Sequence, residues 1–283
     1  MKVGLVLEGG AMRGMFTAGV LDVFLEQHIQ IDGIVAVSAG ALFGVNLPSK
    51  QKGRALRYNK QFLNDKRYLG WHSLLTTGNI VNKAFAFYQV PFVHDVFDND
   101  EFKRSPIDFY ATVTNVESGL AEHIQITDPF AQMEVLRASS AMPYVSKIVD
   151  VDGKKYLDGG IADSIPLDFC QSLGFDKIIV VLTRPFDYRK KPSSPLMSKL
   201  CYHRYPKLAE TLQNRYKIYN QQVEKVITEN ENGNIFVLRP SKDLAIKRIE
   251  KDMNKIQAMY DLGVADTWRE LPALQRYLTN TRG

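Results

Sequence analysis

The fold class is decided by the stretch Ile34-Val35-Ala36-Val37-Ser38-Ala39-Gly40-Ala41-Leu42-Phe43-Gly44. The apolar run before Ser38 predicts a buried strand, and the small and apolar residues after it predict a helix that follows without a linker. A serine at such a corner holds its hydroxyl clear of its neighbours, at the positive end of a helix. The usual pattern is G-x-S-x-G, here A-x-S-x-G, with Ala36 and Gly40 as the small flanking residues. Ser38 is therefore a candidate nucleophile, with an ordinary turn as the alternative.

The same strand-then-helix order opens the chain. Residues 3–7 predict a buried strand ending at Glu8, and residues 14–27 carry apolar side chains at helical spacing. Two such units in succession predict a parallel sheet with helices on its faces. We therefore expect an α/β protein of the three-layer α/β/α type, with a mainly parallel central sheet and Ser38 on a strand–helix elbow.

Shorter patterns predict the later elements. These are strands at 108–114 and 121–126 joined by a hairpin at Ser118-Gly119, a short helix at 132–140, a short strand at 154–157, a buried strand at 177–182, a basic loop at 184–195, a long helix from 196 to 229, a strand at 234–238 and a mostly helical remainder.

Composition indicates an ordinary globular protein. Of its 283 residues, 45% are hydrophobic and 24% are charged, and neither a linker nor an internal repeat divides the chain. We expect a single domain over 1–283, with a motif-bearing part at about 3–182 and a helical C-terminal part at about 196–283. Cys170 and Cys201 have no metal-ligand spacing and are expected to be unpaired in a reducing compartment. The first apolar run is too short for a secretory signal, so we expect a cytoplasmic protein.

The net charge of +5 is unevenly distributed. Two stretches are basic: Lys50, Lys52, Arg54, Arg57, Lys60, Lys66 and Arg67, and then Arg184, Arg189, Lys190, Lys191, Lys199, Arg204 and Lys207. Solvated faces are one interpretation, and attraction to an anionic membrane surface is the other. No nucleic-acid-binding module accompanies the charge, so nucleic acid is not expected as a partner.

A glycine-rich loop follows the first strand: Glu8-Gly9-Gly10-Ala11-Met12-Arg13-Gly14. Glycines in such a loop let backbone N–H groups approach a negatively charged oxygen at a helix N-terminus. The spacing does not fit the G-x-G-x-x-G dinucleotide fingerprint. The loop is therefore a candidate oxyanion hole, and a plain tight turn is the alternative.

The base that would accept the proton of Ser38 is harder to identify. The histidines, which are His28, His72, His94, His123 and His203, stand in no recognisable motif. Asp158 ends a short strand and precedes Gly159 and Gly160, so its carboxylate projects with little steric cover. An aspartate that caps a turn is the alternative.

Four motifs in this order resemble the patatin-like phospholipase family. They are the Gly-rich loop ending in Arg13-Gly14, the Ser38 elbow, the segment Arg137-Ala138-Ser139-Ser140-Ala141-Met142-Pro143 and Asp158-Gly159-Gly160. The resemblance covers about residues 3 to 182, and nothing specific is left to compare after about 185.

The resemblance implies a serine acyl hydrolase with a Ser–Asp dyad and no catalytic histidine. Ser38 would be acylated, and Asp158 would take its proton and later activate water. The backbone amides of the loop Gly9, Gly10, Ala11, Met12, Arg13 and Gly14 would supply the oxyanion hole, chiefly those of Gly10, Ala11 and Met12, with Arg13 holding the loop. Gly40, Gly159 and Gly160 would support the turns.

The implied substrates are carboxyl esters of lipids: phospholipids, lysophospholipids or acylglycerols. No cofactor is implied, and no Asp/Glu cluster resembles a calcium loop, so metal-independent hydrolysis is expected. The aromatic segment 74–93 is expected to pack in the core, with a role in lining an acyl pocket as the alternative. The basic, partly apolar loop 186–196 is a candidate for peripheral contact with the inner membrane surface.

Two positions depart from the family pattern, since Ala11 and Ala36 stand where glycine is usual. Ala36 adds only a methyl group, whereas Ala11 resists a positive φ if the loop requires one. A catalytically weak or inactive acyl-binding or regulatory protein is therefore the alternative function. A third interpretation is an ordinary α/β-hydrolase with His203 as the base. It is disfavoured because the nucleophile elbow of that fold normally follows a later strand.

Overall fold

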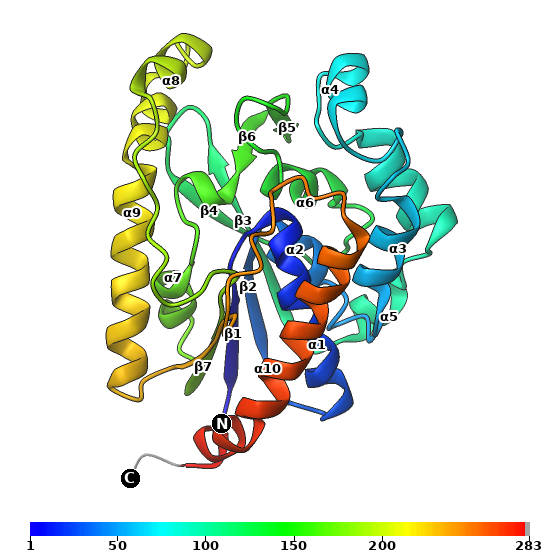
Figure 1. Ribbon diagram of the computed structural model, residues 1–283. Coiled ribbons are helices and arrows are strands. Elements are labelled where there is room, and N and C mark those ends of the chain that lie inside the picture. Colours follow the sequence, from blue (N-terminus) through cyan, green and yellow to red (C-terminus); the bar gives the residue numbers. More distant parts are fainter. Residues whose placement is uncertain (281–283) are drawn as a thin grey trace.

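The computed structural model describes residues 1–280 and contains one central sheet between two layers of helices (Figure 1). The strands are β1 (Val3–Leu7), β2 (Gly33–Val37), β3 (Asp108–Asn115), β4 (Ala121–Gln125), β5 (Val149–Val151), β6 (Lys154–Asp158), β7 (Lys177–Val181) and β8 (Phe236–Leu238). Their order is β5-β6-β3-β2-β1-β7-β8, and β4 pairs with β3 off this path. The run from β3 through β2, β1 and β7 to β8 is parallel, whereas β4, β5 and β6 join antiparallel. The predicted three-layer α/β/α fold with a mainly parallel sheet is confirmed.

Helices and helical turns lie between these strands. They are η1 (Ala11–Gly14), α1 (Met15–Glu26), α2 (Ala39–Gly44), α3 (Arg54–Phe62), α4 (Trp71–Thr77), the π-helix η2 (Lys83–His94), α5 (Asn99–Arg104), α6 (Met133–Ser139), η3 (Gly159–Ile161), α7 (Leu167–Ser172), α8 (Pro195–Cys201), α9 (Pro206–Glu231) and α10 (Met253–Thr279). Helices α7 and α9 cover one face of the sheet, and α1, α2 and α10 cover the other (Figure 1).

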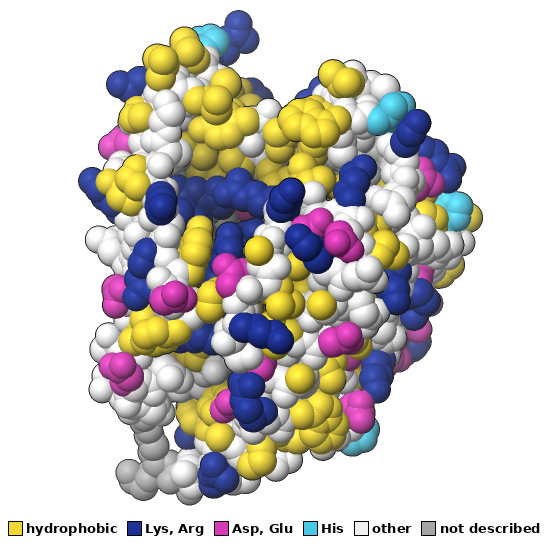
Figure 2. Space-filling model, viewed as in Figure 1, with side chains coloured by type: hydrophobic (Ala, Val, Ile, Leu, Met, Phe, Trp, Pro, Cys, Tyr) yellow, Lys and Arg dark blue, Asp and Glu magenta, His cyan; other side chains and the backbone are white. Residues whose placement is uncertain are grey.

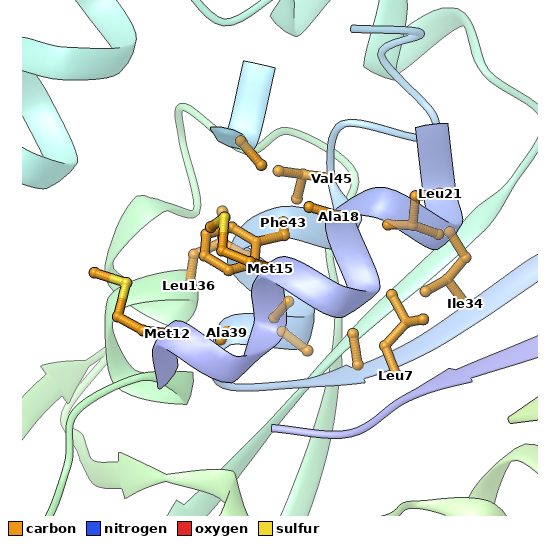
Figure 3. Packing of buried hydrophobic residues seen from close by; sticks show 14 of the residues in the cluster. Leu7, Met12, Met15, Ala18, Leu21, Ile34, Ala39, Phe43, Val45 and Leu136 are labelled. Carbon is orange, nitrogen blue, oxygen red and sulfur yellow. The ribbon is translucent and has the colours of Figure 1, made fainter. Parts of the chain in front are cut away.

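Both faces of the central strands are buried, which explains their continuous apolar sequences. Leu5 and Leu7 of β1 point into the core shared with α1, α2 and α10, whereas Val6 points into the core under α7 and α9. Figure 3 shows Leu7 and Ile34 directed toward α1, where Leu21 lies. Strands of a parallel sheet that is covered on both sides have no solvent face, so polar alternation is absent.

Most predicted elements are present within a residue or two of the expected bounds. The strand expected at 3–7 is β1, the helix expected at 132–140 is α6, and the expected hairpin is the antiparallel pair β3–β4. The predicted turn glycine of that hairpin, Gly119, has a φ of 70°.

One prediction for the C-terminal part is wrong. The long helix expected from 196 to 229 is two helices, because Pro206 has no N–H and disfavours helical backbone at Tyr205, whose φ and ψ are −130° and 70°. The remainder is mostly helical, as expected, because α10 occupies most of it, although residues 239–252 are irregular before α10 begins at Met253. This irregular segment carries Arg248 to the site described below.

Candidate active site

Ser38 and Asp158 meet because β2 and β6 end head to head along β3. Strand β2 pairs with β3 as far as Val37, which lies opposite Thr112, and the next β3 residue, Val113, pairs with Asp158 at the end of β6. Since β2 runs parallel to β3 and β6 runs antiparallel to it, the two strand ends converge. The Ser38 hydroxyl donates a 2.7 Å hydrogen bond to Oδ2 of Asp158, and both residues are buried.

The backbone at Ser38 is strained, and hydrogen bonds and close packing keep it in this conformation. Its φ is 55° and its ψ is −123°, a conformation that costs on the order of 1–3 kcal/mol for a residue other than glycine. The Ser38 N–H donates to Oγ of Ser139 at 2.9 Å, and the Ser139 hydroxyl donates to the carbonyl of Thr112 at 2.7 Å. A Cβ at Gly40 would lie 2.6 Å from the carbonyl oxygen of Leu7, so only glycine allows α2 to approach β1 here.

The Asp158 carboxylate is oriented by its own turn. Its Oδ1 accepts a 2.8 Å hydrogen bond from the N–H of Gly160, which leaves Oδ2 facing Ser38. The hydroxyl of Thr114 donates to the main-chain carbonyl of Asp158 at 2.9 Å. The turn aspartate and the candidate base are therefore the same residue, since one carboxylate oxygen caps the turn and the other contacts the serine.

The pKa of Asp158 is raised above its ordinary value of 3.8 because burial disfavours the charged carboxylate. The positive charge of Arg215 and the hydrogen bonds from Ser38 and Gly160 oppose that rise. Arg215, on α9, also donates a 2.5 Å hydrogen bond to the carbonyl of Gly160. A raised pKa makes the carboxylate a stronger base than an exposed aspartate.

The Gly-rich loop is anchored at Glu8. This buried carboxylate accepts hydrogen bonds from the N–H and the hydroxyl of Thr183, at 2.5 Å and 3.0 Å, and from the hydroxyl of Tyr219, at 2.9 Å. A Cβ at Gly10 would lie 2.6 Å from the Thr183 hydroxyl, so the loop backbone passes directly over the end of β7.

The amides of the loop divide into two groups. The N–H of Met12 donates to the carbonyl of Arg248 at 3.4 Å, and that of Arg13 donates to the carbonyl of Gly10 at 3.1 Å. Within residues 1–280, the N–H groups of Gly9, Gly10 and Ala11 have no acceptor. These three amides are free to bind an oxyanion, whereas Met12 is already engaged.

Ala11 adopts the conformation that its side chain resists. Its φ is 49°, in the left-handed region, where a residue with a Cβ loses roughly 1–2 kcal/mol relative to ordinary backbone. Ala36, the other departure from the family pattern, lies inside β2 between Leu7 and Ala111 and is fully buried.

Two cavities of different character adjoin Ser38. The first is the more polar of the two and is lined by Glu8, Gly9, Gly10, Ala11, Arg13, Ser38, Met142, Pro143, Asp158, Gly160, Ser164, Arg184, Tyr188, Lys190, Arg215, Tyr219 and Arg248. The second is mainly apolar and includes Met12, Leu42, Phe43, Tyr58, Tyr68 and Val81. Ala11, Ser38, Met142 and Arg248 line both, so the serine lies at their junction.

A third, apolar cavity adjoins the second. The two share Leu42, Tyr58, Tyr68 and Val81, and the third is also lined by Phe87, Val90 and Pro91 of η2. In the aromatic segment 74–93, Phe85 and Phe87 both pack in the core, as expected, and Phe87 also borders this cavity.

No histidine of residues 1–280 lines the cavities at Ser38. His203 is exposed, and its Nδ1 lies 3.2 Å from the carbonyl of Leu200. His123 stacks on Phe169, and burial lowers its pKa to about 4. In the same part of the chain, no group of three or more His, Cys, Asp or Glu could hold a metal ion, and no helix is both long and apolar enough to cross a membrane.

Several site residues were not identified from the sequence. Ser139 lies within a motif that was recognised, but its contact with the Ser38 amide had no local signal. Arg215, Tyr219 and Arg248 come from the part of the chain after residue 185, where no motif was available.

Two protein-family models match this chain. A family model described as patatin-like phospholipase matches residues 5–170, and a second, described as a domain of unknown function (DUF6363), matches residues 205–279. The second match contains Arg215, Tyr219 and Arg248, so both matched regions line the polar cavity.

Similar proteins include an Escherichia coli K12 protein called uncharacterized protein YjjU, which is 31% identical over 65% of this chain and 52% of its own length. Lysophospholipase NTE1 of Chaetomium globosum is 29% identical, over 64% of this chain and 12% of its own. Neuropathy target esterase sws of Drosophila melanogaster is 26% identical, over 64% of this chain and 13% of its own length. This chain therefore matches about half of the first relative and a small part of the others.

A crystal structure of VipD from Legionella pneumophila superposes with a TM-score of 0.46 at 12% identity, covering 96% of this chain and 67% of that one. Such a similarity carries no information on activity. The family model spans more than half of the chain and contains both Ser38 and Asp158. The chain belongs to the patatin-like phospholipase family.

Proposed function

We propose that this protein is a serine acyl hydrolase that cleaves carboxyl esters of lipids through a Ser38–Asp158 dyad. The observation that carries the proposal is the 2.7 Å hydrogen bond from the Ser38 hydroxyl to a buried carboxylate, at a strained strand–helix corner. The family and the relatives named lysophospholipases support lipid esters as the substrate class.

In the first step, Oγ of Ser38 attacks the ester carbonyl carbon while its proton passes to Oδ2 of Asp158. The carbonyl oxygen becomes an oxyanion, and the free amides of Gly9, Gly10 and Ala11 are its proposed donors. Collapse breaks the ester bond, the proton goes to the leaving alcohol, and the acyl group remains on Ser38.

In the second step, water replaces the alcohol. Asp158 accepts a proton from this water, which attacks the acyl carbon and releases the fatty acid together with the restored serine hydroxyl. A carboxylate serves as the base for both steps because burial raises its pKa. The hydrogen bond from Gly160 holds the carboxylate in place throughout.

The apolar cavities beside Ser38 are the proposed site of the acyl chain. They adjoin each other at Leu42 and Val81, and their walls are mostly aliphatic or aromatic. Burial of a methylene there contributes about 0.8 kcal/mol, so a long chain would bind much more tightly than a short one.

We also propose peripheral contact with an anionic membrane, made by two exposed apolar tips. Trp71 and Leu75 on α4 are 72% and 84% exposed, and Leu196 and Leu200 on α8 are 64% and 66% exposed. The hydrophobic surfaces of α4 and α8 flank the hollow of the molecule (Figure 2). The proposed contact is therefore made mainly by α8, which follows the loop 186–196 expected from the sequence. Helix α4 makes a second contact with the cytoplasmic face of the membrane.

Vesicle sedimentation tests the membrane proposal. The double variant Leu75→Asp with Leu200→Asp should bind anionic vesicles at least fivefold more weakly, and Val96→Asp, an exposed residue near α5, should bind as the wild type does. Binding should also weaken at high salt, because the Debye length falls to about 3 Å at 1 M. Salt-indifferent binding, or none, contradicts the proposal.

We propose that the motif-bearing and C-terminal parts form a single domain. Strand β8 extends the sheet next to β7, and Arg215 and Arg248 line the cavity at Ser38. Removal of everything after residue 195 is therefore expected to yield no cooperatively folded protein in thermal denaturation.

A fluorophosphonate probe, which labels activated serines, tests the dyad. The wild type should be labelled, Ser38→Ala should not, and Asp158→Asn should be labelled at least a hundredfold more slowly while remaining folded. Ser172→Ala, at an exposed serine, is the matched control. Absence of labelling in folded wild-type protein would instead favour an inactive acyl-binding or regulatory protein.

A further inference from the structure

The polar cavity beside Ser38 carries far more positive than negative charge. Its basic side chains are Arg13, Arg184, Lys190, Arg215 and Arg248, against the two carboxylates of Glu8 and Asp158. Figure 2 shows Lys and Arg side chains gathered in the hollow between the apolar surfaces of α4 and α8.

These cations attract Glu8 and Asp158 at longer range but form no direct ion pair with them. Within residues 1–280, none of the five forms an ion pair with a carboxylate, since none is among the pairs closer than 4.0 Å. The oxygens of Glu8 are already occupied by Thr183 and Tyr219. Of the five, Arg248 is exposed and the others are half-buried, whereas the fully buried Arg54 is paired with Asp95 at 3.3 Å.

Grouping these basic side chains is electrostatically unfavourable, as the lowered pKa values of two of them show. Burial, and then the nearby Arg184, lower the pKa of Arg13 to about 10, and its Nε is buried without a hydrogen-bond partner in the described chain. Burial and the charge of Arg215 lower the pKa of Lys190 to about 6. A buried polar group without a partner is destabilising, so such an arrangement indicates a negatively charged ligand that would satisfy it.

The position of the cavity relative to Ser38 indicates which part of a substrate would meet these charges. An ester held at Ser38 with its acyl chain in the apolar cavity directs its alcohol portion into the polar one, because the serine lies at the junction of the two. Several guanidinium groups match the oxygens of a phosphate, to which each can donate two hydrogen bonds.

We propose that the cationic cavity binds the phosphate of a net anionic alcohol portion, so that the enzyme prefers acyl esters of glycerol phosphate to those bearing a quaternary ammonium group. This inference rests on the function proposed above and adds its substrate class. A phosphocholine group brings its own positive charge into a cavity that already has an excess of such charge, whereas a terminal phosphate neutralises that excess.

Three substrates with the same acyl chain test the proposal: 1-acylglycerol 3-phosphate, 1-acylglycerophosphocholine and 1-monoacylglycerol. They are compared in one nonionic micelle so that membrane attraction does not contribute. The wild type is expected to hydrolyse the phosphate ester with a kcat/KM at least tenfold above that of either of the others. Equal values for the three esters would overturn the proposal.

Substitutions of individual basic residues test which of them determine the preference for the phosphate ester. Lys190→Gln and Arg248→Gln should each lower the ratio of kcat/KM for the phosphate ester over the monoacylglycerol at least fivefold. Lys191→Gln and Lys247→Gln remove exposed charges next to them in sequence and should leave the ratio unchanged. If the control variants lower the ratio equally, general surface charge is responsible and the proposal fails.

Binding to Ser38→Ala separates failure of this proposal from failure of the catalytic one. The wild type could hydrolyse none of the esters. The headgroup site is then still supported if calorimetry shows that 1-acylglycerol 3-phosphate binds at least tenfold more tightly than monoacylglycerol and that Lys190→Gln weakens this binding. Equal affinities overturn it. Inorganic phosphate could instead bind tightly and depend on Lys190 while the protein shows no preference among the lipids. That result would assign the cavity to free phosphate and overturn its role in binding a lipid headgroup.

Discussion

The backbone N–H of Ser38 donates its 2.9 Å hydrogen bond to the hydroxyl of Ser139, a residue 101 positions later in the chain. The same hydroxyl donates to the carbonyl of Thr112, next to the point where β2 ends. Ser139 therefore fixes the strained corner to the middle of the sheet, although it does not itself contact Asp158.

Replacing Ser139 by alanine should reduce turnover without abolishing it. The Ser38 N–H would be buried without an acceptor, which costs about 1–3 kcal/mol, and the hydroxyl of Ser38 would lose its fixed direction. We expect a loss of about tenfold in kcat with little change in KM, and a lower melting temperature. Ser172→Ala, which removes an exposed hydroxyl bonded within α7, is the control. A changed KM with an unchanged kcat would show that Ser139 does not position the nucleophile.

Ala11→Gly should stabilise the protein. The left-handed φ of 49° costs alanine roughly 1–2 kcal/mol, which exceeds the roughly 0.4–1 kcal/mol by which glycine favours the unfolded chain. We expect an increase of about 0.5–1 kcal/mol in the free energy of unfolding by urea, with activity retained or increased.

The same substitution in an ordinary helix provides the control for Ala11. Ala258→Gly, at an exposed position of α10, should lower the free energy of unfolding by about 1 kcal/mol. If both variants destabilise the protein, the strain at Ala11 does not exist in solution.

Leu42→Trp should shift the chain-length preference toward short esters. Leu42 borders both apolar cavities, so a larger side chain there takes up space in each of them. We expect the ratio of kcat/KM for a sixteen-carbon over a four-carbon ester to fall about tenfold or more. Val93→Trp, at an exposed position of η2, should leave the ratio unchanged. Equal loss for both esters would place the long chain elsewhere.

The acidic limb of the pH–rate profile should move when Arg215 is replaced. Asp158 acts as a base only when ionised, so activity falls as the pH falls through its pKa, which burial raises. Arg215 is the foremost group opposing that rise, so Arg215→Gln should raise the pKa further and move the limb to higher pH. Lys217→Gln, exposed on the same helix, should not move it. A limb displaced to lower pH would contradict Asp158 as the base.

Local patterns were sufficient for the central sheet and for the candidate nucleophile. Strands β1 and β2 are short apolar runs bounded by small residues, and their burial on both faces needs no information from distant residues. The helices with a clear 3.6-residue period, such as α1, were likewise predictable. The break between α8 and α9 did have a local signal, because Pro206 disfavours helical backbone at the residue before it, and the prediction of one long helix did not take that signal into account.

The sequence by itself determined that Ser38 stands at a strand–helix corner and that Asp158 ends a strand before two glycines. Steric limits on neighbouring backbone atoms control both features, so they can be read from a few adjacent residues. Only the tertiary structure decided that the antiparallel return of β6 along β3 brings the two within 2.7 Å. It also decided that Arg215 and Arg248 join Arg13 at one cavity, because burial and the clustering of charge depend on segments that are distant in the chain and have no local signature.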